Sequence, residues 1–225
     1  MDRKTVREDV ALRYISGEGI EIGALDFPLR LPRAAQVRYV DYLDPSALEE
    51  AHSQTLAEGR PLVRPDVVDD GTRLAQFADG SLDFVVANHM LEHVEDPISA
   101  LHHQLRVLKP EGVLYLTLPD ARSTFDAARP LTTVEHLLRD HEVGPQSSRR
   151  EHFEECAHII ESRQGAEISA RADEMEAEGM RPHFHVWVPL TFAAFLAAMD
   201  LPFSLVLLQE SVGEFLVILR KRVEA

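Results

Sequence analysis

The chain has 225 residues, of which 45% are hydrophobic, and its formal net charge is −15. This length fits one globular domain with a large core. The excess of acids argues against nucleic acid as a partner, because a phosphate backbone is bound by clustered Lys and Arg.

The chain also carries no signal for a membrane or for an oxidising compartment. No apolar stretch approaches the ~20 residues that cross a bilayer, and the charged first residues lack the apolar region of a signal peptide. The lone cysteine, Cys156, excludes an internal disulfide framework. We therefore expect a cytoplasmic protein with no membrane partner.

Strands and helices alternate over the first 120 residues. The patterns predict, in chain order, a helix over 5–15, strands over 18–22 and 38–44, a helix over 46–58, a strand stub over 65–71, a strand over 81–89, a helix from Pro97 to 109 and a strand over 112–120. This alternation predicts a parallel sheet with helices on both faces.

The alternation of strands and helices ends after residue 120. Residues 121–185 contain helical stretches and little strand signal, and another helix is expected to begin near Pro189. Two apolar runs within 203–221 predict a closing antiparallel hairpin. The whole is expected to be a single domain over 1–225, with a helical insertion at about 121–188.

Three residues near the first two strands suggest what the chain binds. The first strand contains Glu21 and leads into a turn at Gly23, and the second ends at Asp41. A dinucleotide fingerprint needs two more glycines to admit a pyrophosphate, and the negative charge of Glu21 would repel an anion. A carboxylate at Asp41 can accept both ribose hydroxyls. A cationic nucleoside without phosphates satisfies these demands, although each acid taken alone could be a turn residue.

Five sequence motifs resemble those of class I S-adenosylmethionine-dependent methyltransferases. They are EIGAL, RYVDYLD, VVDDG, FADGSLDFVVANHMLEHVEDP and LKPEGVLYLTLPD. The resemblance implies a Rossmann-like α/β fold with a seven-stranded, mostly parallel sheet and an antiparallel C-terminal strand. It also implies that Asp41 binds the ribose, that Asp70, with Asp69 as the alternative, meets the adenine amine, and that Asn88 lies near the amino-acid moiety. The family's usual second and third glycines are missing after Gly23.

The segment HMLEH, residues 89–93, also reads as an inverted zinc-protease motif. That motif needs both histidines on one helix face, but His89 directly follows a buried strand. His93 is instead expected at the mouth of the cofactor site, and Tyr14 is expected to close over the cofactor.

Methyl transfer to a hydroxyl requires a general base, a metal ion, or both. Our candidates for catalysis are Asp120, His141, His152 and His185, and the insertion also offers His136, Asp140, Arg149, Arg150 and His183. Asp120, His141 and His185 are the candidate ligands for Mg²⁺, although Mg²⁺ prefers oxygen. The alternative is that these histidines have structural roles only.

The insertion resembles that of bacterial methyltransferases linked to polysaccharide synthesis, including sugar 1-O-methyltransferases of methylmannose polysaccharide synthesis. The resemblance implies a hydroxyl of a small saccharide as acceptor and a dependence on Mg²⁺. Two alternatives stay open: an N- or C-methyltransferase of another small metabolite, and a non-catalytic S-adenosylmethionine-binding protein. Apolar positions on the insertion helices suggest a homodimer.

Overall fold

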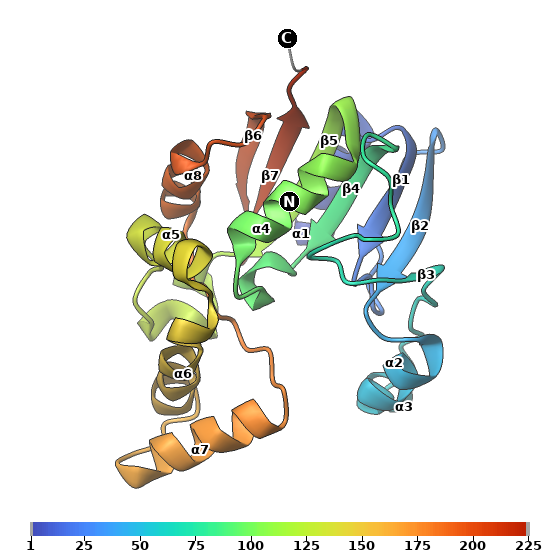
Figure 1. Cartoon of the computed structure of the whole chain (residues 1–225). Helices are drawn as coiled ribbons and strands as arrows, with labels where there is room; N and C mark the ends of the chain where they lie inside the picture. The colour runs from blue at the N-terminus through green and yellow to red at the C-terminus, as the bar shows by residue number, and fades with distance from the viewer. Residues whose placement is uncertain (1, 224–225) are drawn as a thin grey trace.

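The computed structural model describes residues 2–223 and contains one seven-stranded sheet, in the order β3-β2-β1-β4-β5-β7-β6 (Figure 1). The strands are β1 (Gly17–Ile22), β2 (Ala35–Asp41), β3 (Val67–Val68), β4 (Leu82–Asn88), β5 (Leu108–Pro119), β6 (Phe203–Ser211) and β7 (Glu214–Lys221). The first five strands pair in parallel, and β7 runs antiparallel to both of its neighbours. This sheet confirms the predicted Rossmann-like class.

The helices are α1 (Arg3–Tyr14), α2 (Pro45–Ala51), α3 (Ser53–Ala57), α4 (Pro97–Val107), α5 (Val134–Val143), α6 (Gln146–Glu155), α7 (Ala166–Ala177) and α8 (Pro189–Ala198). Four single turns, η1 (Leu91–His93), η2 (Ala121–Ser123), η3 (Phe125–Ala128) and η4 (Cys156–Ile160), complete the set. The single helix predicted over 46–58 is wrong, because the chain bends at His52, where φ is −114° and ψ is 30°. None of the helices described is long and apolar enough to span a bilayer.

Side chains alternate across the sheet and build two separate cores. Ile20 and Val85 point to the face that is covered by α4, α5 and α8. Phe84 and Val86 point to the other face, where α1 packs. Figure 1 shows α4 in front of the sheet and α1 behind it. Period-two alternation in a strand buried on both faces produces the continuous apolar run seen in the sequence.

Helix α1 is held to the sheet by a buried ion pair. Arg7 Nε and Nη2 donate to the two carboxylate oxygens of Glu214, at 2.8 and 2.5 Å. Glu214 opens β7 and is fully buried, and it also contacts His89 Nε2 at 2.7 Å. Burial raises the pKa of Glu214, but the hydrogen bonds from Arg7 and His89 outweigh this and hold it below its ordinary value.

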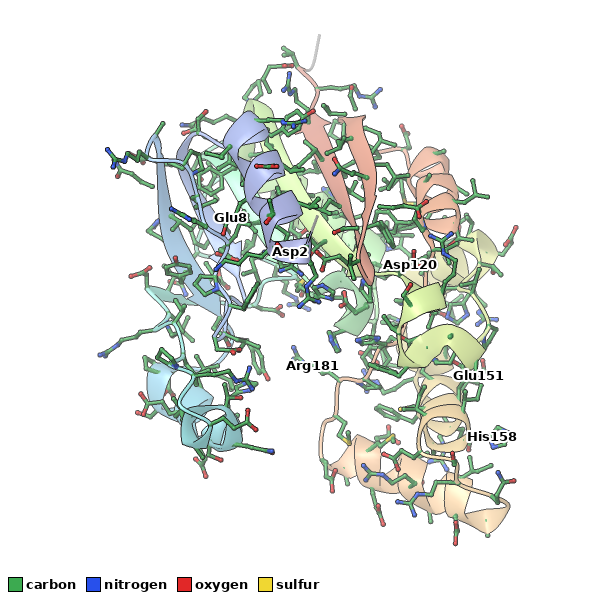
Figure 2. All side chains as sticks on the ribbon, turned by 180° about the vertical axis from the view of Figure 1, so that it is seen from behind. Asp2, Glu8, Asp120, Glu151, His158 and Arg181 are labelled. Carbon is green, nitrogen blue, oxygen red and sulfur yellow. The ribbon has the colours of Figure 1, made fainter. Side chains whose placement is uncertain are left out.

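Residues 121–188 contain only helices and irregular segments. Helices α5, α6 and α7 follow one another away from the sheet, and the chain then returns past Arg181 to α8 (Figure 2). In both views α2 and α3 lie across from this returning segment. The residues between these two parts form the site described below.

Replacing Arg7 by Met should lower the free energy of unfolding by about 3 kcal/mol, because a buried carboxylate loses its bidentate partner. Urea denaturation would measure the loss. Arg13→Met, at an exposed position of the same helix, serves as the control and should cost under about 0.5 kcal/mol. Equal losses in the two variants would contradict the role given to the ion pair.

Candidate functional site

A cavity of about 830 Å³ lies at the carboxyl ends of β1, β2 and β4. On the sheet side it is lined by Gly23, Asp41, Asp70 and Asn88, and on the insertion side by residues of α6 and of 176–184. In parallel α/β sheets ligands bind at this edge of the strands. The volume is within the range of sites that enclose a small molecule.

The turn after β1 has the geometry of a close approach between backbone and ligand. Gly23 adopts φ of +63°, and a Cβ built on it would meet nothing within 4 Å. Two residues later, Leu25 adopts φ of +48°, a left-handed conformation that glycine usually supplies. The Leu25 carbonyl accepts a hydrogen bond from the Val63 amide at 2.6 Å, which helps to hold this turn. Leu25 thus holds a left-handed conformation in this turn without being glycine.

Glu21 lies just behind the cavity and supports its floor. Its two carboxylate oxygens accept from the Leu29 amide at 3.0 and 3.1 Å, and Oε1 also accepts from Asn88 Nδ2 at 3.2 Å. Burial raises the pKa of Glu21 to about 7 despite these hydrogen bonds. Glu21 thus orients the turn and Asn88, and Asn88 itself faces the cavity.

Of the other predicted cofactor residues, Asp41, Asp70 and His93 line the cavity, whereas Asp69 and Tyr14 do not. Burial raises the pKa of Asp41. The side chain of Asp69 instead accepts from the amides of Asp70 and Gln76, both at 2.8 Å. Tyr14 packs against the core around α1 rather than over the cavity, because α1 covers the opposite part of the sheet. The expectation for Tyr14 is therefore wrong.

The far wall of the cavity is strongly polar. Five carboxylates and three arginines line the cavity as a whole, namely Asp41, Asp70, Glu95, Asp96, Glu176, Arg73, Arg149 and Arg181. The Arg181 guanidinium lies over the Tyr42 ring at 4.6 Å and so joins the two rims. An excess of negative charge suits a cationic ligand and opposes a pyrophosphate.

His89 and Glu92 form a charged pair beneath the cavity. His89 follows β4 with φ of +48°, and its two ring nitrogens face Glu214 at 2.7 Å and Glu92 at 3.3 Å. Burial lowers its pKa, but the two carboxylates prevail, so that the pKa of His89 lies above its ordinary value. His89 and His93 do not share an α-helix, because Leu91–His93 is a single 3₁₀ turn. This geometry excludes the zinc-protease arrangement.

His93 and His183 each have Nδ1 paired and Nε2 available, close to the segment that returns past Arg181. His93 Nδ1 donates to the carbonyl oxygens of Arg181 and Pro182 at 2.8 and 3.1 Å, so its Nε2 keeps a lone pair. His183 Nδ1 is paired with Asp126 at 2.7 Å. One donor atom each from Glu92, His93 and His183 lie within 4.8 Å of one another. These three residues could hold a divalent cation at the edge of the cavity.

The predicted Mg²⁺ ligands do not meet, and this prediction is wrong. Asp120 pairs with Arg122, whose Nε and Nη2 lie 2.9 and 2.5 Å from its carboxylate oxygens. His141 pairs with Asp96 at 3.0 Å, and His185 lies buried in another cluster. Within residues 2–223, no group of three metal-binding side chains combines these residues. Each of the three is held by a nearer partner that the sequence pattern did not show.

None of the four predicted catalytic side chains lines the large cavity. His152 and His185 lie side by side with His136, at ring-centroid distances of 5.0 to 5.8 Å. Burial lowers the pKa of His185 to about 3 and that of His152 to about 4, and the neighbouring imidazoles add to both shifts. His183 and His185, which are two residues apart, lie in different clusters.

The two aromatic residues beside these histidines, Phe184 and Trp187, are also separated. Phe184 lines the large cavity, whereas Trp187 packs with Phe192 and Phe195 in the core. The site residues that sequence reasoning missed are chiefly Glu92, Tyr42 and Arg181. Glu92 belongs to the segment HMLEH, but nothing in the sequence predicted that Glu92 would lie beside His183.

The raised pKa of Glu21 predicts a pH dependence of stability. The folded carboxyl titrates near pH 7 and the unfolded one near 4.5, so the folded state binds more protons between these values and stability falls as pH rises through the window. In the absence of ligand, Glu21→Gln should gain about 3 kcal/mol relative to the wild type between pH 4.5 and pH 8. Urea denaturation at both pH values would measure this, and a constant difference would contradict it.

Comparison with known proteins agrees with this geometry. Residues 16–116 match the methyltransferase domain family. The thiol S-methyltransferase TMT1B of Homo sapiens is 40% identical over 78 residues, which are 34% of this chain and 32% of that protein. The match thus spans about a third of the curated relative.

Two solved structures show the fold. The SAM-dependent methyltransferase from Methanosarcina mazei is 18% identical, with 94% of this chain and 96% of that chain covered, at a TM-score of 0.50. The CurJ carbon methyltransferase is 13% identical, with 99% and 54% covered, at a TM-score of 0.52. Residues 16–116 thus resemble a methyltransferase domain, and the two solved structures share the fold of this chain.

Proposed function

We propose that this chain transfers the methyl group of S-adenosylmethionine to a hydroxyl of a small saccharide. The observation that carries the proposal is the large cavity, which has cofactor-type carboxylates on one wall and the free Nε2 of His93 on the other. It is larger than a nucleoside needs, so there is room for an acceptor beside the cofactor.

The sheet side of the cavity fits S-adenosylmethionine. Gly23 leaves open space beside the backbone, Asp41 ends β2 where a ribose would be bound, and Asp70 follows β3. In this assignment Asp41 accepts the ribose hydroxyls, and Asp70 accepts from the adenine amine. The surplus of carboxylates favours the sulfonium and ammonium charges of the cofactor.

The acceptor would lie between the cofactor and His93. Its oxygen attacks the methyl carbon as the C–S bond breaks, S-adenosylhomocysteine leaves, and the hydroxyl proton passes to His93 Nε2. The Arg181 and Pro182 carbonyls fix the ring with its proton on Nδ1, so that Nε2 is ready to accept. His89 is unsuited to this task, because its two carboxylate partners favour the protonated ring.

The proposed dependence on Mg²⁺ has little support in the donor set. Glu92, His93 and His183 offer one oxygen and two nitrogens, whereas Mg²⁺ selects oxygen ligands and water. A cation of the first transition series fits this set better. When bound, it would occupy His93 Nε2 and so replace this histidine as the base, acting as a Lewis acid that lowers the pKa of a hydroxyl.

A saccharide agrees with the polar wall of the cavity, where Glu95, Asp96, Arg149 and Arg181 offer donors and acceptors and Phe184 offers an apolar surface. The curated relative favours a thiol acceptor as the second candidate. A cytoplasmic location and a homodimer belong to the same proposal. The lone Cys156 is buried and unpaired, as expected in a reducing compartment.

Replacing Asp41 by Asn should weaken the binding of S-adenosylhomocysteine about 10- to 100-fold, because a charge-assisted hydrogen bond is worth about 1.5–3 kcal/mol. Isothermal titration calorimetry would measure the dissociation constant. Glu49→Gln, at an exposed position of the neighbouring α2, should leave it unchanged. Unchanged affinity in Asp41→Asn would contradict the ribose assignment.

Replacing His93 by Gln should lower kcat at least about 100-fold, since general-base catalysis contributes about 10²–10⁴. The dissociation constant of S-adenosylhomocysteine should change less than about twofold. His102→Gln, exposed on α4, is the control. A loss of cofactor affinity with kcat preserved would show that His93 binds cofactor rather than acts as the base.

The function itself is tested by an acceptor screen. The chain is incubated with S-adenosylmethionine and sets of mono- and disaccharides, thiols and amines, and S-adenosylhomocysteine is measured by mass spectrometry. Product formed only with saccharides supports the proposal. Turnover restricted to thiols or amines would reassign the acceptor, and tight cofactor binding without any turnover would support a regulatory binding protein.

A further inference from the structure

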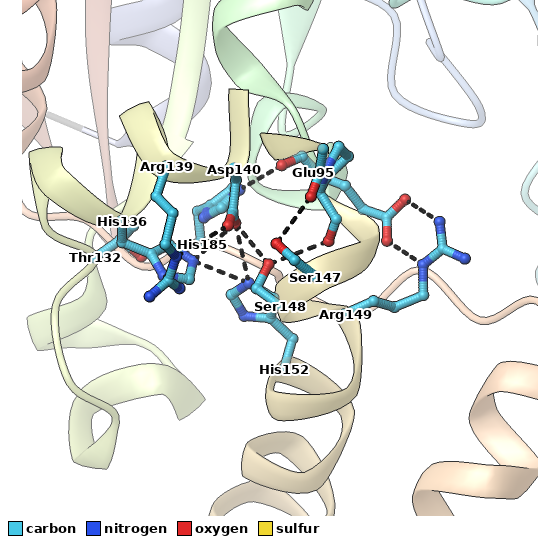
Figure 3. Close-up of polar contacts among 12 residues, drawn as sticks. Glu95, Thr132, His136, Arg139, Asp140, Ser147, Ser148, Arg149, His152 and His185 are labelled. Atoms are coloured by element: carbon cyan, nitrogen blue, oxygen red, sulfur yellow. Dashed lines mark hydrogen bonds and ion pairs between the residues drawn. The ribbon is translucent and has the colours of Figure 1, made fainter. Parts of the chain in front are cut away.

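Three histidines from separate segments meet outside the cofactor cavity. His136 lies on α5, His152 on α6 and His185 on the segment before α8. Figure 3 shows their rings gathered around Asp140. One donor nitrogen from each ring lies within 4.8 Å of the other two.

Asp140 supplies a fourth donor at the same point. Its Oδ2 lies 3.1 Å from His136 Nε2 and 3.9 Å from His152 Nε2, and the two Nε2 atoms are 3.1 Å apart. The carboxylate is held by Ser148, which donates from Oγ to Oδ2 at 2.6 Å. The other oxygen, Oδ1, is buried and has no hydrogen-bond partner, although Arg139 Nε lies 3.7 Å from it. A buried carboxylate with a free oxygen is costly unless something binds it.

His185 shows a second unused donor atom. Its side chain is fully buried, and its Nε2 donates to the Glu95 carbonyl at 3.2 Å. The ring proton is therefore on Nε2, and Nδ1 keeps its lone pair without any partner. A carbonyl partner of this kind is typical of histidines that bind metal through the other nitrogen.

We propose that His136, His152, His185 and Asp140 form a binding site for one Zn²⁺ ion. Zinc–nitrogen bonds of about 2.0–2.1 Å in a tetrahedron place neighbouring donors about 3.3 Å apart. Two of the separations, both 3.1 Å, are close to this value, and the third, 3.9 Å between His152 Nε2 and Asp140 Oδ2, is longer. Three imidazoles and one carboxylate suit Zn²⁺ and related transition metals and are unsuited to Mg²⁺ or Ca²⁺.

An adjoining cavity and the side chain of Arg139 determine how the ion would reach the cluster. A second cavity of about 470 Å³ is lined by His136, Arg139 and His152 and gives access from solvent. Arg139 Nη2 lies 2.9 Å from His136 Nδ1, where the ring must carry its proton when Nε2 binds metal. Arg139 is half exposed, so its guanidinium can turn into solvent.

The ion would add a link between three segments that already share hydrogen bonds such as Ser148 to Asp140. Four protein ligands are typical of a structural zinc site. By linking α5, α6 and the chain at His185, the ion would also fix His183 and Phe184, which precede His185 on the acceptor side. The inference concerns stability and does not depend on the methyl-transfer activity.

The test titrates chelator-treated protein with Zn²⁺ alone and measures bound metal by mass spectrometry and the melting temperature. We expect one equivalent at this cluster and a rise in Tm, because a ligand that binds only the folded state stabilises it. Co²⁺ in its place should give the visible absorption of a tetrahedral site. His136→Gln and His152→Gln should each lose one equivalent and the rise in Tm.

His158→Gln is the matched control, since His158 is exposed on η4 directly after α6 and lies outside the cluster. It should bind as the wild type does. His93→Gln with His183→Gln separates the cavity edge from this cluster. The proposal is overturned if no Zn²⁺ binds, or if folded His136→Gln and His152→Gln retain all of the metal. Loss of that metal only in the His93/His183 double variant would also overturn it.

Discussion

The structure depends on one buried carboxylate, Glu214. It accepts hydrogen bonds from Arg7 and contacts His89, so it joins the first helix, the last strand and the end of β4 at a single point. His89 in turn faces Glu92, which precedes His93. The floor of the cavity is thus built on charges that are buried together and would be costly apart. This network raises the pKa of His89, which favours its protonated form, and the proposed function gives the role of base to His93 instead.

The cavity combines two kinds of wall with different origins. The sheet side is made of side chains at strand ends, where parallel pairing fixes their positions. The insertion side is made of side chains on helices and an irregular segment, and the contact of Arg181 with Tyr42 joins the two. In the proposed function the first wall binds the cofactor and the second binds the acceptor, and the family match ends at residue 116, before the second wall.

Much of the sheet side could be predicted from the sequence, because short apolar runs indicate the strands and the turn residues after them indicate where each strand ends. Gly23, Asp41, Asp70 and Asn88 all face the cavity. The insertion could not be predicted in this way. Whether Asp120 meets a metal or Arg122, and whether His183 lies beside His93 or His185, depends on tertiary packing that local spacing does not encode. Tyr14 was misplaced for the same reason, since the face that α1 covers is set by Arg7 and its distant partner.

The link between Arg7 and Glu214 spans 207 positions of the chain, and this bears on how the protein is made. A ribosome releases Arg7 early and Glu214 near the end of this sequence, so α1 waits for its partner through most of synthesis. Until β7 has been added, Arg7 has no carboxylate to dock against and His89 lacks one of its two partners. The floor of the cavity is therefore completed only when the last strand emerges. A nascent chain that stops before residue 214 would present the cofactor motifs without the support that holds them.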